Sequence, residues 1–384
     1  MYSIALSAGE ASGDMFGGAL VDEMKRLRGD LVFWGAGGPR MREAGVKITA
    51  DMTGGGTIGI SETLKSLPGV CIRYFRLRGE LLRSRPDVFV PIDFGAFNIR
   101  LGQIANANGI RVVYYLPPSS WRRRPGNADK LIACGGRVIT QFPWSADALC
   151  KQGVDARFVG HPLVDIVKPT RDRGAFLSEL GLAESAPTIG LLPGSRIHEI
   201  SEHLDMMIGC ARIIHEELGG AQFVIGAANR GPMMAKRIER MASEIPSLPP
   251  IRVVEGRTYD CMAHSDFLIT KSGTATLEAA ILGTPMVIVY RGTPVMRFEF
   301  LFRKAILEDF IGLPNIIARR GVCPEFINDD AVAAKVADVA LGIMRSDALM
   351  DKMKSELKGV RDALGERGAV GRAAEMILDM GGLV

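Results

Sequence analysis

The chain has 384 residues, more than one hydrophobic core usually supports, so we expect two domains. Its 47% hydrophobic content and 45 glycines are typical of a globular α/β protein with many tight turns. The net charge of +4 is too small to indicate a nucleic-acid-binding protein, and no recognition-helix or zinc pattern points to one.

The cysteines and the apolar runs indicate the compartment. The six cysteines include no Cys-x-x-Cys pair, so we expect reduced thiols in a cytoplasmic protein. The N-terminal stretch has no basic region and too short an apolar run for a signal peptide. No segment approaches the ~18 continuous apolar residues of a membrane span. We therefore expect a soluble chain whose only membrane contact is peripheral.

Strand-like apolar runs alternate with helical patterns in both halves of the chain, which predicts parallel sheets covered by helices. The runs are Ser3–Ser7, Leu31–Trp34, Val88–Ile92, Val112–Leu116, Val138–Thr140 and Arg157–Val159, then Thr188–Leu192, Gln222–Ile225, Ile251–Val254, Phe267–Ile269 and Met286–Tyr290. A polar stretch, Lys168 to Arg173, separates the two sets and predicts domains at residues 1–167 and 168–361. Glycine-rich turns follow four of these runs, which predicts a cleft between the domains.

The first of these turns runs from Ala8 to Asp14 and opens a helix. Its glycines let the backbone approach a ligand closely, so we expect Ser12 and Gly13 to contact a substrate. Glu10 and Asp14 would lie at the edge of the cleft, where a carboxylate can accept a proton. The competing interpretation is that Ser12 or Asp14 only caps the helix, which leaves Glu10 unexplained.

The turn Leu191–Arg196 places Arg196 where a helix begins in the second half. An arginine offers a planar, permanently charged fork to phosphate oxygens. The chain has no Asp-x-Asp pattern, which argues against the metal clamp of many sugar-nucleotide enzymes. None of the five histidines has a metal-ligand spacing, and His161 is at least as well explained by a structural role as by ligand binding. We expect neither a metal nor a cofactor.

The stretch from Asp266 to Arg291 reads as strand, turn, helix and strand. Its turn, Ser272-Gly273-Thr274, places backbone N–H groups and hydroxyls at a helix N-terminus, which suits a phosphate or sugar hydroxyls. Glu278 shares a face with Thr274 and is a candidate acceptor for ribose hydroxyls, while Thr276 would lie near phosphate. An ordinary βαβ unit explains the stretch equally well when it is taken alone.

Two segments interleave apolar and charged side chains. Leu64–Arg85 has the pattern of a basic amphipathic helix that lies on an anionic membrane surface. Met296–Lys304 is unusually aromatic and could face acyl chains. An ordinary helix that packs on the core remains the alternative for both segments.

Several motifs occur in the same order as in a known enzyme family, along nearly the whole chain. The chain resembles the lipid-A-disaccharide synthase family of inverting glycosyltransferases, which have the two-domain GT-B fold. The motifs are AGEASGD (Ala8–Asp14), GAGGPRM (Gly35–Met41), FVGHPLVD (Phe158–Asp165), LLPGSR (Leu191–Arg196), SGTATLEAA (Ser272–Ala280), PMVIVYR (Pro285–Arg291) and LPN (Leu313–Asn315).

The resemblance implies two Rossmann-like domains that face a cleft, with a last helix (residues 362–384) crossing back to the first domain. It implies that a UDP-2,3-diacylglucosamine donor and a 2,3-diacylglucosamine 1-phosphate acceptor are joined β-1,6 without metal, on the cytoplasmic face of the inner membrane. By analogy, Arg196, Thr274, Thr276, Glu278 and Asn315 would hold UDP. Leu64–Arg85 would meet lipid. Oligomeric state stays open, a homodimer included.

One region departs from the family pattern. Where the family reads I-D-A-P-D-F-N, this chain reads Ile92-Asp-Phe-Gly-Ala-Phe-Asn98. The second Asp of the family motif, which is the family's proposed active-site acid or base, is therefore Ala96 in this chain. Pro117–Arg124 also differs from the family's S-P-S-V-W-A-W-R. Inversion by direct displacement needs a base near the acceptor hydroxyl, and we assign that role to Asp93, with Glu10 second.

Three alternatives stay open beside this interpretation. One is a related UDP-sugar glycosyltransferase with another lipid acceptor, and a second is an enzyme like UDP-N-acetylglucosamine 2-epimerase, which has a similar fold. The third is an inactive paralogue that binds UDP-sugar and membrane without turnover, for which Ala96 is the main support.

Overall fold

The computed structural model describes residues 1–52, 60–118, 126–227, 233–243, 249–292 and 310–383. The chain divides into two compact units. Unit 1 comprises Met1–Ile166 with Leu364–Val384, and unit 2 comprises Val167–Ala363. Within the described residues, no helix is both long enough and apolar enough to cross a membrane.

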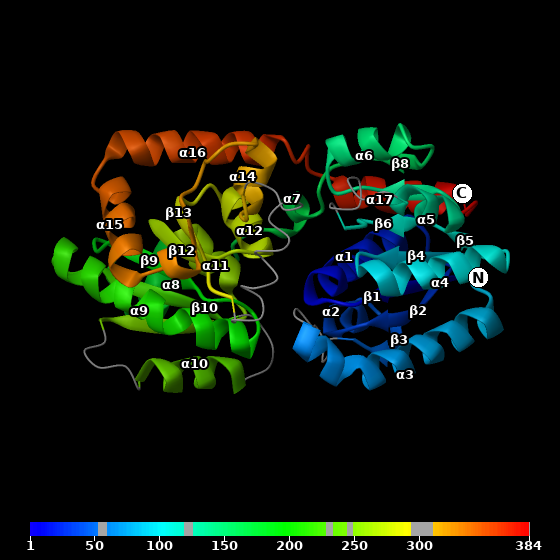
Figure 1. The fold of residues 1–384 in the computed structure, drawn as a ribbon, viewed down its shortest axis with the longest axis horizontal. Helices are drawn as coiled ribbons and strands as arrows, with labels where there is room; N and C mark the ends of the chain where they lie inside the picture. The colour runs from blue at the N-terminus through cyan, green and yellow to red at the C-terminus, as the bar shows by residue number, and fades with distance from the viewer. Residues whose placement is uncertain (53–59, 119–125, 228–232, 244–248, 293–309, 384) are drawn as a thin grey trace. The chain divides into compact units, whose positions relative to one another are not determined.

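Unit 1 is built on a parallel sheet with the strand order β3-β2-β1-β4-β6-β7-β8, and β5 also pairs with β4 (Figure 1). The strands are β1 (Tyr2–Ala8), β2 (Leu31–Gly37), β3 (Lys47–Asp51), β4 (Val88–Ile92), β5 (Arg111–Val112), β6 (Tyr114–Tyr115), β7 (Arg137–Ile139) and β8 (Asp155–Arg157). The helices are α1 (Ala11–Leu27), α2 (Pro39–Glu43), α3 (Ile60–Ser84), α4 (Gly95–Ala107), α5 (Asn127–Ala133), α6 (Pro143–Cys150), α7 (Leu163–Ile166) and α17 (Ala369–Met380).

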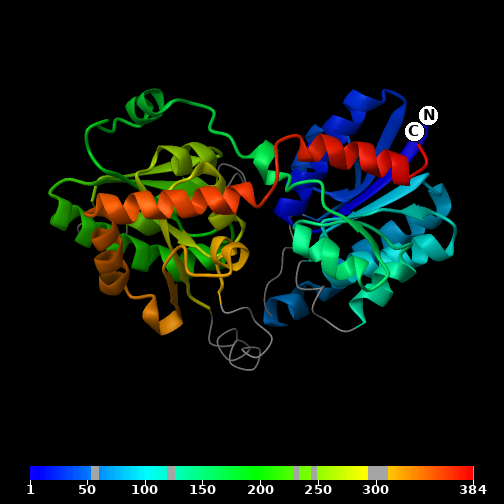
Figure 2. The ribbon, with the colours of Figure 1, turned by 90° about the horizontal axis from the view of Figure 1, so that it is seen from above.

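Burial explains the sheet of unit 1. All five residues of β4 are buried, as its continuous apolar sequence requires for a strand covered on both faces. Side chains of α3, α4 and α5, among them Leu77, Leu101 and Leu131, share one hydrophobic core with the sheet. Figures 1 and 2 show the last helix, α17, within unit 1, where it packs along α1. The Asp165 carboxylate fixes the start of α17 by accepting hydrogen bonds from the N–H groups of Gly368 (2.6 Å) and Val370 (2.9 Å).

Unit 2 has a second parallel sheet with the strand order β11-β10-β9-β12-β13-β14. Its strands are β9 (Thr188–Leu192), β10 (Gln222–Ala227), β11 (Ile251–Glu255), β12 (Phe267–Lys271), β13 (Met286–Tyr290) and β14 (Glu325–Ile327). Its helices are α8 (Arg173–Glu179), α9 (Ile197–Leu218), α10 (Met233–Ser243), α11 (Thr258–His264), α12 (Thr274–Leu282), α14 (Leu313–Ala318), α15 (Ala333–Met344) and α16 (Asp347–Asp362), with a short 3₁₀ turn at Asn328–Asp330.

The predicted parallel sheets covered by helices are confirmed. The edge strands β3 and β14 were not predicted, because both mix polar with apolar residues. The expected strand at Val112–Leu116 is two short strands, and the one expected at Arg157–Val159 ends at Arg157. Strand order reverses at β1 and β4 in unit 1, and at β9 and β12 in unit 2. Ligands of such sheets bind at the carboxyl ends of strands beside this reversal.

Candidate functional site

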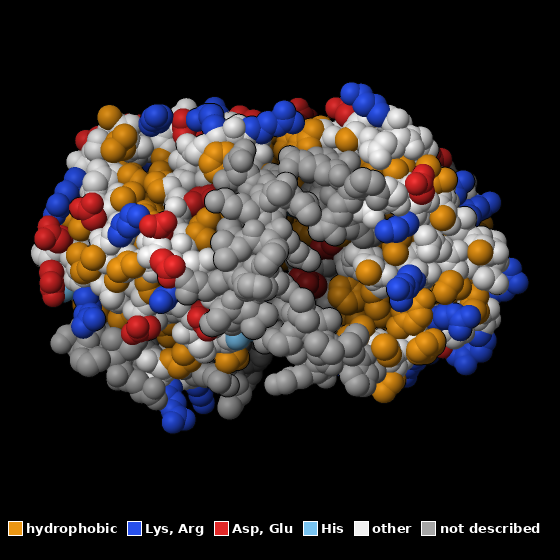
Figure 3. Space-filling model, in the orientation of Figure 1, with side chains coloured by type: hydrophobic (Ala, Val, Ile, Leu, Met, Phe, Trp, Pro, Cys, Tyr) orange, Lys and Arg blue, Asp and Glu red, His pale blue; other side chains and the backbone are white. Residues whose placement is uncertain are grey.

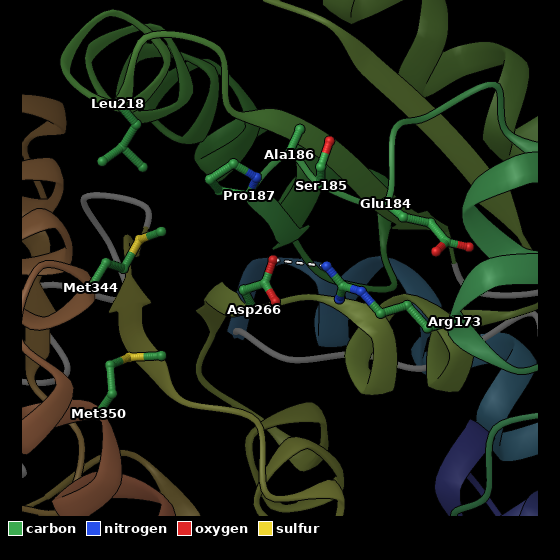
Figure 4. Close-up of a pocket in the computed structure, with 9 residues that line it drawn as sticks. All are labelled: Arg173, Glu184, Ser185, Ala186, Pro187, Leu218, Asp266, Met344 and Met350. Atoms are coloured by element: carbon green, nitrogen blue, oxygen red, sulfur yellow. Dashed lines mark hydrogen bonds and ion pairs between the residues drawn. The ribbon is translucent and has the colours of Figure 1, made fainter.

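One pocket of the structure lies away from those strand ends. It has a volume of about 350 Å³ and is bordered by the Arg173–Asp266 ion pair (3.0 Å), by Pro187 and by two methionines (Figure 4). Asp266 and Pro187 directly precede β12 and β9, so this pocket is at the amino ends of the strands. We therefore look for the site at the opposite, carboxyl ends.

The carboxyl ends of β9 and β12 carry a compact charged cluster in unit 2. The Glu199 carboxylate lies 3.3 Å from the Arg196 guanidinium and 3.0 Å from the Lys271 ammonium. It also accepts hydrogen bonds from the backbone N–H groups of Ser195 (3.0 Å) and Arg196 (3.3 Å), which closes the first turn of α9. Gly194 permits this approach, because a Cβ there would lie 2.7 Å from Glu199.

These partners hold Glu199 ionised. The side chain is nearly buried, which by itself would raise its pKa, but the adjacent Lys271, the Ser195 N–H and the Arg196 charge together lower the pKa to about 2. The cluster thus consists of two cations and one carboxylate, and all three side chains are at most 14% exposed. Sequence reasoning found Arg196 but missed Glu199 and Lys271.

His203 ties the cluster to β13. Its Nε2 accepts a hydrogen bond from the Arg291 N–H (2.9 Å), so Nδ1 carries the proton and donates to the Glu199 carbonyl (2.7 Å). Burial, together with the nearby charges of Lys271 and Arg291, lowers the His203 pKa to about 4. The neutral imidazole adds no charge to the cluster and fixes the chain where it leaves β13.

The start of α12 contains the predicted residues Ser272, Gly273, Thr274 and Thr276. The helix begins at Thr274 after Gly273, which makes no side-chain cap. The buried Thr276 hydroxyl donates to the Gly273 carbonyl (2.8 Å), and the Ser272 hydroxyl donates to the Ile311 carbonyl (2.8 Å). Thr276 therefore shapes the turn, whereas Thr274 is the half-exposed hydroxyl at its mouth.

Glu278 lies one turn further along α12. Its carboxyl accepts a hydrogen bond from the Tyr259 hydroxyl (3.1 Å), and desolvation raises its pKa to about 7. A carboxyl with this pKa is held in an environment that disfavours its charge, which is common at functional sites. Tyr259 is a further residue that sequence reasoning did not identify.

The Asn315 side chain is buried and its hydrogen-bonding capacity is filled by protein. Its amide nitrogen donates to the Cys323 carbonyl and the Glu325 carboxylate (both 2.7 Å), and its oxygen accepts from the N–H groups of Val322 (2.7 Å) and Cys323 (2.8 Å). Glu325 also accepts from the N–H groups of Ile311 and Gly312. The Asn315 side chain therefore organises the loop around α14, and the UDP contact that the analogy implied stays a prediction.

In unit 1, Asp93 follows β4 directly. Asp93 and Phe94 both have left-handed backbone conformations, with φ of 47° and 52°, which cost of order 1 kcal/mol or more each in residues with a Cβ. The Asp93 carbonyl accepts hydrogen bonds from the Asn98 amide (3.0 Å) and the Tyr114 hydroxyl (2.8 Å), which hold it in this conformation. The buried Asn98 amide oxygen accepts from the Ser7 hydroxyl (2.6 Å).

The Asp93 carboxyl has a pKa raised to about 6, first by desolvation and then by the negative charge of Glu10. The two predicted catalytic carboxyls are thus electrostatic neighbours. Gly9 lets the turn carrying Glu10 approach the Asp93 loop, because a Cβ at Gly9 would overlap the Phe94 ring at 2.1 Å. Ser12 is half-buried and Gly13 buried in the first turn of α1. Ala96 is exposed, and Ser119–Arg124 lie outside the described residues.

Asp14 and His161 in unit 1 both have structural roles. The buried Asp14 carboxylate caps α2 by accepting from the N–H groups of Gly38 (2.7 Å), Arg40 (3.0 Å) and Met41 (3.1 Å), so a capping role is favoured over the expected proton-accepting one. His161 is buried against the rings of Phe16 and Phe142, and its Nδ1 accepts from the Leu163 N–H (3.2 Å). Burial lowers its pKa to about 3, so the structural interpretation of His161 is favoured.

The basic amphipathic segment forms most of α3. Leu77 and Leu81 are buried in the core, whereas Ile72 is 68% and Phe75 63% exposed. Figure 3 shows hydrophobic side chains gathered beside basic ones over this part of unit 1. A series of ring contacts joins Phe75 through Tyr74, Phe97 and Phe94 to the Asp93 loop, with centroid separations of 5.0–5.5 Å. The side chains of 60–68 and all of Met296–Lys304 lie outside the described residues.

The described residues contain no group of three or more His, Cys, Asp or Glu side chains that could hold a metal ion. The positive charge at the ends of β9 and β12 comes from Arg196 and Lys271. The two strand-end regions therefore offer different functional groups. Unit 2 offers cations and a helix start suited to an anion, beside the Glu278 carboxyl, whereas unit 1 offers Asp93, a carboxyl with a raised pKa next to a second carboxyl, Glu10.

Comparisons with known proteins cover nearly the whole chain. A family model described as lipid-A-disaccharide synthetase matches residues 4–372. The lipid-A-disaccharide synthase of Syntrophus aciditrophicus (strain SB) is 35% identical over 98% of this chain and 97% of its own length. The protein of the same name from Geobacter sulfurreducens is 35% identical over 99% of this chain and 97% of its own.

Solved structures with low sequence identity share the fold. The UDP-GlcNAc 2-epimerase of Neisseria meningitidis, solved with UDP-GlcNAc, has a TM-score of 0.61 at 13% identity and covers 99% of this chain and 100% of its own. CalG4, the calicheamicin glycosyltransferase, has a TM-score of 0.58 at 15% identity, with coverage of 100% and 99%. At such identities the likeness concerns fold alone, and it confirms the predicted GT-B architecture of two Rossmann-like sheets.

Proposed function

The chain belongs to the lipid-A-disaccharide synthetase family, and we propose that it is the glycosyltransferase that forms the lipid A disaccharide. Its donor would be UDP-2,3-diacylglucosamine and its acceptor 2,3-diacylglucosamine 1-phosphate, joined by a β-1,6 bond. The observation that carries the proposal is the cationic cluster of Arg196 and Lys271 beside the start of α12, at the carboxyl ends of adjacent strands β9 and β12.

The donor side of the proposal uses unit 2. The UDP diphosphate would meet Arg196 and the N-terminal N–H groups of α12, where the helix dipole favours negative charge. Ser272, Gly273 and Thr274 would line this turn, with Thr276 holding its shape from inside. Glu278 would accept the ribose hydroxyls, and Tyr259 orients its carboxyl. Asn315 would act indirectly, by fixing the loop around α14.

The acceptor side uses unit 1. The Asp93 carboxylate would take the proton of the acceptor's 6-hydroxyl as its oxygen attacks the anomeric carbon of the donor. The bond to UDP breaks with its electron pair passing to the β-phosphate oxygen, so one direct displacement inverts the configuration. Glu10, whose charge raises the pKa of Asp93, would tune this base, and Ser12 and Gly13 would contact the sugar. A base with a pKa near 6 is mostly ionised, yet still basic, at neutral pH.

Lipid binding fits the exposed face of α3. Ile72 and Phe75 would enter the interfacial region of the membrane, with the basic side chains of the helix near anionic lipid headgroups. The aromatic contacts from Phe75 to the Asp93 loop support an acylated acceptor next to that carboxyl. We place the protein at the cytoplasmic face of the inner membrane. A homodimer is also part of the proposal, and none of the residue roles described above depends on it.

Product identification tests the proposal against its alternatives. Purified protein incubated with both acylated sugars should release UDP and disaccharide in equal amounts, measured by mass spectrometry. UDP release only with a different acyl-sugar acceptor would indicate a related transferase. Conversion of UDP-GlcNAc to an epimerised sugar would indicate an epimerase, and tight UDP binding without product from any acceptor would indicate an inactive paralogue.

A further inference from the structure

We propose that Lys271 is a second cationic ligand of the donor diphosphate, and that Glu199 holds it in place until the donor binds. This inference rests on the donor site proposed above and adds a residue to it. Lys271 would then share with Arg196 the neutralisation of the leaving UDP, the part that a metal ion plays in many sugar-nucleotide enzymes.

The position of Lys271 is the first support. It is the last residue of β12 and directly precedes the Ser272-Gly273-Thr274 turn. β12 pairs with β9, which leads into Arg196, so the two cations come from neighbouring strands at the reversal of strand order. Residues on this edge of a parallel sheet are the ones that meet a bound ligand.

The charge count is the second support. Besides Lys271, Glu199 has the Arg196 guanidinium and two backbone N–H donors as partners. Lys271 adds a second cation, and the three side chains, which are 8–14% exposed, carry one positive charge in excess. A cation held so far from water lacks full hydration, so an excess of this kind favours binding of an anion.

The third support is the hydrogen-bonding capacity of the ammonium group, which has three N–H donors. Among the described residues, Glu199 provides the one acceptor that Lys271 contacts, at 3.0 Å, and the Tyr290 ring lies 6.0 Å from the ammonium. The remaining donors are available to phosphate oxygens while the ion pair with Glu199 persists. Lysine is a common phosphate ligand in this point-charge manner.

The test compares binding of UDP and of uridine by calorimetry in the wild-type chain and in Lys271→Met. Loss of a hydrogen bond to a charged group predicts that UDP binds about 10- to 100-fold more weakly. Uridine, which has no phosphate, should bind within about twofold of wild type, since small effects are the rule away from a contact. Lys271→Arg should recover most of the UDP affinity. Equal UDP binding by wild type and Lys271→Met would overturn the inference.

The double variant Glu199→Gln/Lys271→Met separates contact from charge, because it restores the excess positive charge on Arg196 without restoring the lysine. It also removes the carboxylate whose loss of a partner could impair folding of the single variant, as thermal unfolding would reveal. UDP binding that stays weak in the double variant supports a direct contact, and recovered binding overturns it. A wild-type chain that binds no UDP would instead contradict the donor site itself.

Discussion

The two units share an architecture but end their central strands in opposite chemistry. In unit 2, two cations surround a single carboxylate whose pKa is lowered to about 2. In unit 1, the carboxyls of Asp93 and Glu10 repel each other and the pKa of Asp93 is raised to about 6. The same strand–turn–helix geometry is therefore suited to binding an anion in unit 2 and to accepting a proton in unit 1. The side chains at the turn, and not the fold, assign the role.

The largest predicted effect lies in unit 1. Asp93→Asn should lower turnover about 10²- to 10⁴-fold, because a positioned base typically contributes that much. UDP affinity should be unchanged, since Asp93 belongs to the other unit. The wild-type rate should rise with pH through about 6 as Asp93 ionises, and the variant should lose this limb. Steady-state kinetics across pH 5–8 measures both, and an unaltered pH profile would remove Asp93 from the mechanism.

A stability measurement probes the cluster in unit 2. Glu199→Ala leaves two nearly buried cations without their carboxylate and should cost about 3–5 kcal/mol of unfolding free energy. The Glu199 pKa is lowered from 4.5, so its stabilisation is present above pH 4.5 and is lost as pH falls toward 2. Glu216→Ala, an exposed change on the same helix, is the matched control and should stay within about 0.5 kcal/mol. Equal urea midpoints for the two variants would refute the cluster's role.

Substitution of Glu278 tests whether unit 2 also contains a carboxyl that contributes to binding at a cost in stability. Its pKa is raised to about 7, so the folded state holds the proton more tightly, and stability is lost as pH rises from 4.5 through 7. Glu278→Gln keeps an acceptor for Tyr259 but cannot become charged. Because the wild-type carboxyl is mostly ionised at pH 8, this change should stabilise the fold by about 1–3 kcal/mol at that pH. The same change should weaken UDP binding. Thermal unfolding at pH 5 and pH 8 measures the first effect, and a pH-independent difference would argue against it.

The smallest effect concerns the lipid side of unit 1. Ile72→Ser with Phe75→Ser should weaken binding to anionic vesicles about 10-fold, because two exposed apolar side chains no longer enter the interface. Ile132→Ser, on an exposed apolar residue of α5, is the control and should have no effect. Vesicle sedimentation gives both values. Equal losses from the two variants would mean that α3 is not the docking face.

Local patterns predicted what depends on local sequence. The apolar runs gave the central strands, and the turns after β1, β9 and β12 pointed to Glu10, Arg196 and Ser272. What escaped prediction depends on contacts between distant segments. Lys271 joins Glu199 across 72 positions only because β9 and β12 pair, and Asp14 caps a helix that begins 25 residues later.

Asn315 shows the same limit from the other side. Its motif matched the family, but the four hydrogen bonds that fill its amide come from residues 322–325, whose placement follows from a short edge strand that the sequence pattern does not reveal. A motif therefore identified the neighbourhood of the site, and only packing showed which side chains of it remain available to a ligand.

The division of labour between the units is tested most directly by measuring donor affinity and single-turnover transfer side by side in Arg196→Ala and Asp93→Asn. The account predicts that Arg196→Ala weakens donor binding about 10-fold or more, whereas Asp93→Asn binds donor normally and transfers at least about 100-fold more slowly. If both variants lost donor affinity to the same degree and kept wild-type transfer from the bound donor, the assignment of the two units would be contradicted.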